Sequence, residues 1–117
     1  MLDAATGSAD QPIAFAKVAR TMGIPVRIIA IDINAKMLKM AKEETSGYPE
    51  IHLVQSDILA LPFKDEGFDL AINNLSLHHF SWRKAVFIIK AIYNSARLGF
   101  LINDLHRSRI AHAAIFL

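Results

Sequence analysis

Short runs of aliphatic and β-branched residues alternate along this chain with longer segments whose apolar residues recur at helical spacing. Such short, nearly continuous apolar runs are typical of strands buried on both faces of a sheet. The pattern predicts five such strands, at Met1–Ala5, Val26–Ile31, Ile51–Gln55, Phe68–Asn73 and Gly99–Asn103. We therefore expect five strands joined by crossover connections rather than by tight hairpins.

The segments between these runs carry helix signals. They predict helices at Gln11–Met22, Ala35–Glu44 and Trp82–Ala96, and a fourth from Arg107 onward. Asp10, Asn34 and Ser81 stand immediately before the first three helices, where a side-chain oxygen can accept a hydrogen bond from a free backbone N–H. Between the third and fourth strands, Pro62 and Gly67 favour a loop over Leu61–Gly67 in place of a full helix.

Strands that alternate with helices predict an α/β fold, in which a parallel sheet is covered by helices on both faces as a three-layer αβα sandwich. In sheets of this kind, ligands bind at the carboxyl ends of the strands, where the strand order switches. The residues at the five strand ends therefore decide which function the sequence supports.

Composition narrows the class of protein. With 117 residues, 53% of them hydrophobic and 21% charged, the chain is not a disordered or low-complexity protein. A net charge of +2 without a basic block gives no reason to expect a nucleic-acid partner. No signal peptide or membrane-spanning segment is recognisable, so we expect a cytoplasmic protein that does not bind membranes. The absence of cysteine excludes disulfides and thiolate metal sites.

The first two strand ends carry candidate cofactor-binding residues. The first strand runs into a turn of small residues that contains Asp3 and Gly7, and the second ends at Asp32, where a carboxylate can grip a ribose diol. A dinucleotide-binding turn is one interpretation. Asp10 argues against it, because it would lie where the pyrophosphate must bind. S-adenosylmethionine has no phosphate and is cationic at its ammonium and sulfonium, so it suits an acidic pocket better.

Four segments, in register with the strand pattern, resemble the class I S-adenosylmethionine-dependent methyltransferases, in particular the small-molecule branch that includes quinone-biosynthesis enzymes. They are Leu2–Ala9, Ile31–Leu38, Ser56–Phe63 and Phe68–His79, which resemble the first to fourth motifs of that family. The resemblance implies a Rossmann-like sheet in the order 3-2-1-4-5 that lacks the family's last two strands. It also implies that residues 1–117 are a single cofactor-binding core, cut at both ends.

The resemblance implies that the methionine end of the cofactor lies along the first motif, at Asp3, Ala5, Thr6 and Gly7. It also implies that the backbone carbonyl of Asn73 accepts a hydrogen bond from the cofactor ammonium. The family's first motif usually carries further glycines where this chain has Ala5 and Ala9, and we expect the extra methyl groups to weaken cofactor binding.

For the adenosine end, the resemblance implies that Asp32 accepts hydrogen bonds from both ribose hydroxyls and Asp57 from the adenine amino group. Ile33 and Met37 would flank the adenine, and the backbone of Ile58 would lie beside the ring.

The expected reaction is in-line attack of a small-molecule nucleophile on the sulfonium methyl group, for which orientation and a dry pocket suffice. No catalytic base is identified. His79 and Asp104 are the candidates, and capping of the next helix is an equally good interpretation of Asp104. No metal site is expected, since no third ligand is spaced to join His78 and His79.

Two other functions remain open at this point. One is a nicotinamide-binding Rossmann domain, and the other is a non-catalytic methyltransferase-like remnant that acts by association. The apolar edge strand and the C-terminal helix make a homodimer one possible state of the protein.

Overall fold

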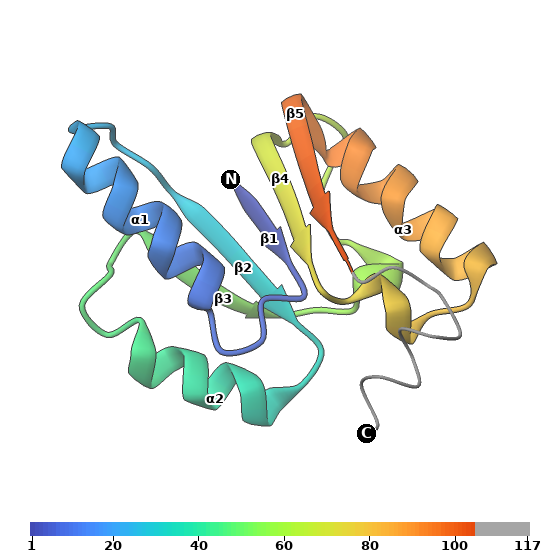
Figure 1. The fold of residues 1–117 in the computed structure, drawn as a ribbon, viewed down its shortest axis with the longest axis horizontal. Coiled ribbons are helices and arrows are strands. Elements are labelled where there is room, and N and C mark those ends of the chain that lie inside the picture. Colours follow the sequence, from blue (N-terminus) through green and yellow to red (C-terminus); the bar gives the residue numbers. More distant parts are fainter. Residues whose placement is uncertain (105–117) are drawn as a thin grey trace.

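The computed structural model describes residues 1–104, which form one five-stranded parallel sheet in the order β3-β2-β1-β4-β5 (Figure 1). The strands are β1 (Leu2–Ala4), β2 (Ile28–Asp32), β3 (Ile51–Gln55), β4 (Phe68–Asn74) and β5 (Ala96–Asn103). The predicted fold class and strand order are confirmed. The sheet's order reverses between β1 and β4, which pair directly along Leu2↔Ala71, Asp3↔Ile72 and Ala4↔Asn73.

Helices cover both faces of the sheet. They are α1 (Asp10–Met22), α2 (Ala35–Glu44) and α3 (Trp82–Ser95), with short 3-10 turns at η1 (Ile58–Ala60) and η2 (Leu77–His79). Ala16 of α1 packs on Ile28 and Ala30 of β2. Ile88 of α3 belongs to a separate cluster with Ile31, also from β2. Because alternate residues of a strand point to opposite faces, α1 and α3 lie on opposite sides of β2, as expected for a three-layer sandwich.

Two of the three predicted helix caps are confirmed. The side-chain oxygen of Asn34 accepts hydrogen bonds from Lys36 N and Met37 N at 3.0 and 3.3 Å, and Ser81 Oγ accepts one from Lys84 N at 3.3 Å.

The prediction that Asp10 caps α1 is wrong. Asp10 is the first residue of the helix, and the cap is Ala9, in the left-handed conformation with φ 70° and without a side-chain hydrogen bond. The Asp10 carboxylate instead accepts a hydrogen bond from Ser8 Oγ at 3.1 Å. At this position its charge still lies favourably in the first turn of the helix.

β5 begins at Ala96, three residues before the predicted Gly99, because α3 ends at Ser95 and the strand follows without a loop. Pairing of Phe68 with Ala96 and an ion pair between Asp69 and Arg97 at 2.6 Å hold this early part of the strand against β4. The helix predicted from Arg107 onward lies outside the described residues. Within residues 1–104, no helix is long and apolar enough to cross a membrane.

Candidate functional site

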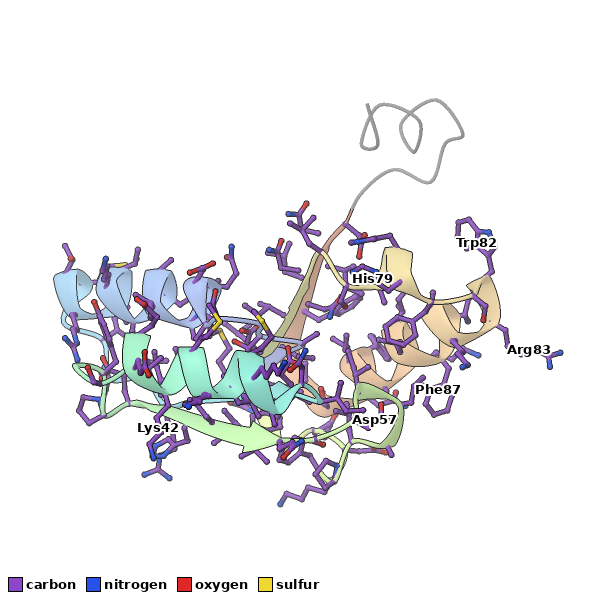
Figure 2. All side chains as sticks on the ribbon, turned by 90° about the horizontal axis from the view of Figure 1, so that it is seen from below. Lys42, Asp57, His79, Trp82, Arg83 and Phe87 are labelled. Carbon is purple, nitrogen blue, oxygen red and sulfur yellow. The ribbon has the colours of Figure 1, made fainter. Side chains whose placement is uncertain are left out.

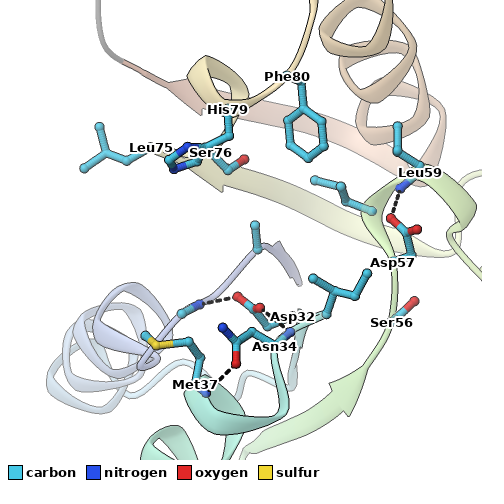
Figure 3. Close-up of a pocket in the computed structure, with 14 residues that line it drawn as sticks. Asp32, Asn34, Met37, Ser56, Asp57, Leu59, Leu75, Ser76, His79 and Phe80 are labelled. Atoms are coloured by element: carbon cyan, nitrogen blue, oxygen red, sulfur yellow. Dashed lines mark hydrogen bonds between the residues drawn. The ribbon is translucent and has the colours of Figure 1, made fainter. Parts of the chain in front are cut away.

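A cavity of about 500 Å³ opens at the carboxyl ends of the strands (Figure 3). This volume lies within the usual range for small-molecule sites. Four chain segments form its wall, one after each of β1, β2, β3 and β4. In order they contribute Ala5 and Gly7; Asp32, Ile33, Asn34 and Met37; Ser56, Asp57, Ile58 and Leu59; and Leu75, Ser76, His79 and Phe80. Its position is therefore the one that the strand order predicts for a ligand.

The turn after β1 adopts the left-handed conformation at every second residue. Ala5, Gly7 and Ala9 have φ values of 64°, 58° and 70°. A Cβ atom at Gly7 would meet Met37 Cε at 3.6 Å, which is ordinary contact, so backbone conformation rather than space favours glycine there. The same conformation is unfavourable for Ala5 and Ala9, at roughly 1–2 kcal/mol for an L-residue.

Asp32 links the turns after β1 and β2. Its Oδ2 accepts a hydrogen bond from Gly7 N at 2.9 Å, and its Oδ1 accepts one from Asn34 N at 2.8 Å. A carboxylate has about four acceptor positions, so each oxygen keeps capacity for a further donor. Two backbone groups thus orient this carboxylate at the cavity wall, where it can accept hydrogen bonds from a diol.

Asp57 and the apolar residues form the adjoining part of the wall. Leu59 N donates to Asp57 Oδ1 at 2.9 Å, which begins η1 and holds the carboxylate (Figure 3). The Asp57 side chain is exposed, immediately before η1 (Figure 2). Ile33 is 62% exposed although it is a large apolar residue. Ile33 and Met37 lie on the Asp32 side of the cavity, and Ile58 lies beside Asp57. Acidic groups at an apolar cleft suit the polar edges of a nucleoside with an apolar ring face.

Three of the predicted cofactor residues do not line the cavity. Asp3, Thr6 and Asn73 are buried beneath it. Thr6 Oγ1 donates to Asp3 Oδ2 at 2.5 Å, and the Asn73 amide donates to Ala4 O at 2.8 Å and to Ser76 Oγ at 2.6 Å. Their predicted contacts with a cofactor remain predictions, and what the structure shows is their support of the turns after β1 and β4.

Burial raises the pKa of the Asp3 carboxyl from 3.8 to about 6. The hydrogen bond from Thr6 lowers the pKa, and the negative charge of Asp32 raises it further, but loss of hydration is the largest cause. Shifted pKa values of this kind occur often at functional sites.

The turn after β4 closes the opposite side of the cavity. Leu75 has a φ of 55° and donates its N–H to Asn103 O at 2.7 Å. Figure 3 shows Leu75, Ser76, His79 and Phe80 across the cavity from Met37 and Asn34.

The two candidate catalytic residues are placed differently. His79 lines the cavity. Asp104 does not, and its carboxylate accepts a hydrogen bond from Leu77 N and lies 2.7 Å from His78 Nδ1 in the turn after β4. Among the described residues, no three histidine, aspartate or glutamate side chains lie close enough to hold a metal ion.

Asn34 was predicted as a helix cap and not as a site residue, although it lines the cavity. Five further wall residues were not predicted as site residues: Ser56, Leu59, Leu75, Ser76 and Phe80. Ser56 and Leu59 flank the predicted Asp57 and Ile58, so proximity to a strand end could have indicated them. The remaining three follow β4, where only the path of the turn decides which side chains face the cavity.

A family model described as a methyltransferase domain matches residues 1–99. The chain belongs to this methyltransferase family. The resemblance to class I S-adenosylmethionine-dependent methyltransferases is thereby confirmed. A related sequence is the demethylmenaquinone methyltransferase of Staphylococcus carnosus, 40% identical over 68 residues. That match covers 58% of this chain and 27% of the relative. This chain therefore spans about a quarter of the length of the curated relatives it matches.

Solved structures agree with this assignment. A putative methyltransferase from Bacillus halodurans superposes with a TM-score of 0.75 at 25% identity, over 98% of this chain and 48% of its own. A phosphoethanolamine N-methyltransferase from Haemonchus contortus, solved with phosphoethanolamine and S-adenosylhomocysteine, has a TM-score of 0.71 at 14% identity. This second match covers 82% of this chain and 19% of the neighbour, and at such identity it shows the shared fold alone.

Proposed function

We propose that this methyltransferase chain binds S-adenosylmethionine in the cavity and directs its methyl group to a small-molecule acceptor. The observation that carries the proposal is the carboxylate of Asp32, which Gly7 N and Asn34 N orient at the cavity wall. Asp57 is a second carboxylate of the wall, and among residues 1–104 no lysine or arginine lines the cavity. Such a site attracts a cationic ligand and repels a pyrophosphate.

The residues present fit the cofactor. Asp32 would hold the ribose hydroxyls, Ile33 and Met37 one side of the adenine, and Asp57 with the Ile58 backbone its polar edge. When bound, the cofactor supplies a methyl group on a sulfonium, which leaves as a neutral thioether. The chain's own contribution is to hold the two reactants in line and to exclude water, which is worth up to about 7–11 kcal/mol in well-aligned cases.

For the acceptor, we propose a small molecule with an apolar ring system, such as a quinol. Leu75 and Phe80 offer apolar surface on the side of the cavity opposite Met37, and His79 adds a polar group there. The related proteins named demethylmenaquinone methyltransferase act on a molecule of this type. His79 would contact the acceptor, and transfer would proceed by direct in-line displacement.

The deciding experiment is a pair of binding titrations on the 117-residue chain. We expect S-adenosylhomocysteine to raise the melting temperature and to bind in calorimetry, and NAD and NADP to do neither. Stabilisation by NAD or NADP without any effect of S-adenosylhomocysteine would overturn the proposal in favour of a nicotinamide-binding domain.

Methyl transfer is measured separately, by mass spectrometry with a reduced short-chain demethylmenaquinone. Binding of S-adenosylhomocysteine without transfer to this acceptor, together with a dimeric mass in solution, would favour the alternative of a non-catalytic domain that acts by association. Transfer by a monomer would exclude that alternative.

A further inference from the structure

Both carboxylate oxygens of Asp104 contact the turn after β4. Its Oδ2 accepts a hydrogen bond from Leu77 N at 2.5 Å, and its Oδ1 lies 2.7 Å from His78 Nδ1. The side chains of His78 and Asp104 are 26% and 14% exposed, so both contacts are partly shielded from water. Asp104 follows the last residue of β5, so one side chain joins the ends of two neighbouring strands.

The pair determines the orientation of the His78 ring. An ionised carboxylate only accepts hydrogen bonds, so the proton in this contact is on His78 Nδ1. A histidine held in this way has both its tautomer and its ring plane fixed. The ring of His79 lies against it, with centroids 4.0 Å apart and planes inclined by 45°. The wall residue His79 therefore rests on a ring that Asp104 immobilises.

The same turn contains a backbone conformation that needs support. Leu75 is a branched residue at φ 55°, is 46% exposed, and lies at the cavity wall. Conformations of this kind persist only where surrounding contacts hold them. The hydrogen bond from Leu75 N to Asn103 O and the two contacts of Asp104 tie the turn to the end of β5 at three successive points.

We propose that His78 and Asp104 are a positioning pair, which holds Leu75 and His79 in place as the acceptor side of the cavity. The assignment of this side of the cavity to the acceptor rests on the proposed function. The contact between His78 and Asp104 exists in the free protein and does not depend on it. His78 acts through its Nδ1–H donor and not as a catalytic base, so another donor at the same place can replace it.

Four variants test this role. Asp104→Ala and His78→Ala remove the pair. His78→Asn keeps an N–H donor close to the place of Nδ1 and removes the rest of the imidazole. Asp69→Asn is the matched control, since it removes the charge from the ion pair between Asp69 of β4 and Arg97 of β5, neither of which lines the cavity. Circular dichroism and melting curves first establish whether each variant folds. If the alanine variants do not fold, the measurements on the wild-type protein and on His78→Asn test the proposal.

The spectroscopic readout is the histidine tautomer in ¹⁵N-labelled protein, measured without ligand. We expect wild-type His78 in the Nδ1–H form, and loss of that form in Asp104→Ala but not in Asp69→Asn. An Nε2–H form of His78 in the wild-type protein would overturn the proposal, whatever the chain binds or methylates.

The functional readout separates the two sides of the cavity. In Asp104→Ala and His78→Ala, we expect the KM of the reduced demethylmenaquinone to rise about tenfold or more, while the Kd of S-adenosylhomocysteine changes less than about threefold. His78→Asn should recover the KM in part, because it restores the N–H donor to Asp104 but not the ring against which His79 packs. If the KM of the acceptor and the Kd of S-adenosylhomocysteine rise by the same factor, the pair has a general structural role. If His78→Asn has a normal KM but a kcat that is largely lost, His78 is a catalytic residue. Either result refutes the positioning role. Where no turnover occurs, the NMR signals of His79 are used instead. Their shift on addition of S-adenosylhomocysteine is compared among the wild-type protein and the variants.

If wild-type protein binds no S-adenosylhomocysteine, the proposed function fails, and the tautomer measurement still decides whether the pair exists.

Discussion

Asp3 is a buried acid whose replacement should raise the stability of the fold and so test the cost of its charge. It is 1% exposed in the centre of the sheet, and the hydrogen bond that the structure shows for its carboxylate comes from Thr6 Oγ1. An amide at this position keeps an oxygen that can accept from Thr6 and carries no charge. We therefore predict that Asp3→Asn stabilises the ligand-free protein.

The magnitude follows from the pKa of Asp3. A rise from 3.8 to about 6, at about 1.4 kcal/mol for each unit, means that the ionised carboxylate lowers the free energy of unfolding by about 3 kcal/mol. Between these two values the folded protein binds more protons than the unfolded chain. The contribution of Asp3 therefore makes stability fall as the pH rises from about 4 to about 6, and stay low above that range.

Urea denaturation measures this directly. The free energy of unfolding of Asp3→Asn should exceed that of the wild-type protein by up to about 3 kcal/mol near pH 7.5, less the cost of burying the amide N–H groups, and the difference should be about 1.5 kcal/mol smaller near pH 5. Asp65→Asn is the control, because Asp65 is an exposed acid in the loop before β4 and its replacement should change little at either pH.

An equal or lower stability of Asp3→Asn at pH 7.5, or a difference that does not shrink toward pH 5, would refute the claim that burial of an ionised carboxylate destabilises the fold. The same variant should bind S-adenosylhomocysteine more weakly, because the resemblance places Asp3 near the methionine end of the cofactor, whose ammonium would favour an ionised carboxylate. Gain in stability and loss of affinity in one variant would identify Asp3 as a group kept for binding.

Three further outcomes are expected. Ala5→Gly and Ala9→Gly should each raise the free energy of unfolding by about 0.5–1 kcal/mol, because both residues have positive φ; the same change at Ala41, inside α2, should lower it in the same denaturation assay. Asp32→Ala should weaken binding of S-adenosylhomocysteine by about 1–3 kcal/mol in calorimetry, and unchanged affinity would exclude its assigned role. Ser81→Ala should lower the free energy of unfolding by about 1 kcal/mol, and a loss below about 0.3 kcal/mol would contradict the cap of α3.

The sheet could be predicted from the sequence because it depends on local pattern. Short runs rich in aliphatic residues mark β2 and β3 to within two residues. Asn34 marks the start of α2 through hydrogen bonds that span only two or three positions. The prediction of the cap of α1 was wrong because the local pattern offered more than one hydrogen-bond partner. The carboxylate of Asp10 has a competing partner in Ser8, and sequence alone does not rank the two.

The cavity wall was predicted only in part, because it depends on how the turns run in space. Asp32 ends β2 and Asp57 follows β3, and both line the cavity, whereas Asp3 and Asn73 lie within β1 and β4 and are buried. The contact between His78 and Asp104 joins residues 26 positions apart. No spacing rule connects them, so Asp104 was considered as a base or a cap rather than as the partner of its neighbour across the sheet.

Several unfavourable features of this fold collect at the carboxyl ends of its strands. Three of the four described residues with positive φ other than glycine, Ala5, Ala9 and Leu75, lie in the turns after β1 and β4, and Asp3 holds a carboxylate away from water. Ala5 and Leu75 line the cavity, and Asp3 is buried in the strand that leads to it. Strain and buried charge persist where the surrounding structure or a ligand compensates for them. Removal of these features one at a time should therefore stabilise the protein, and where a feature serves the ligand, as we propose for Asp3, the same change should weaken binding.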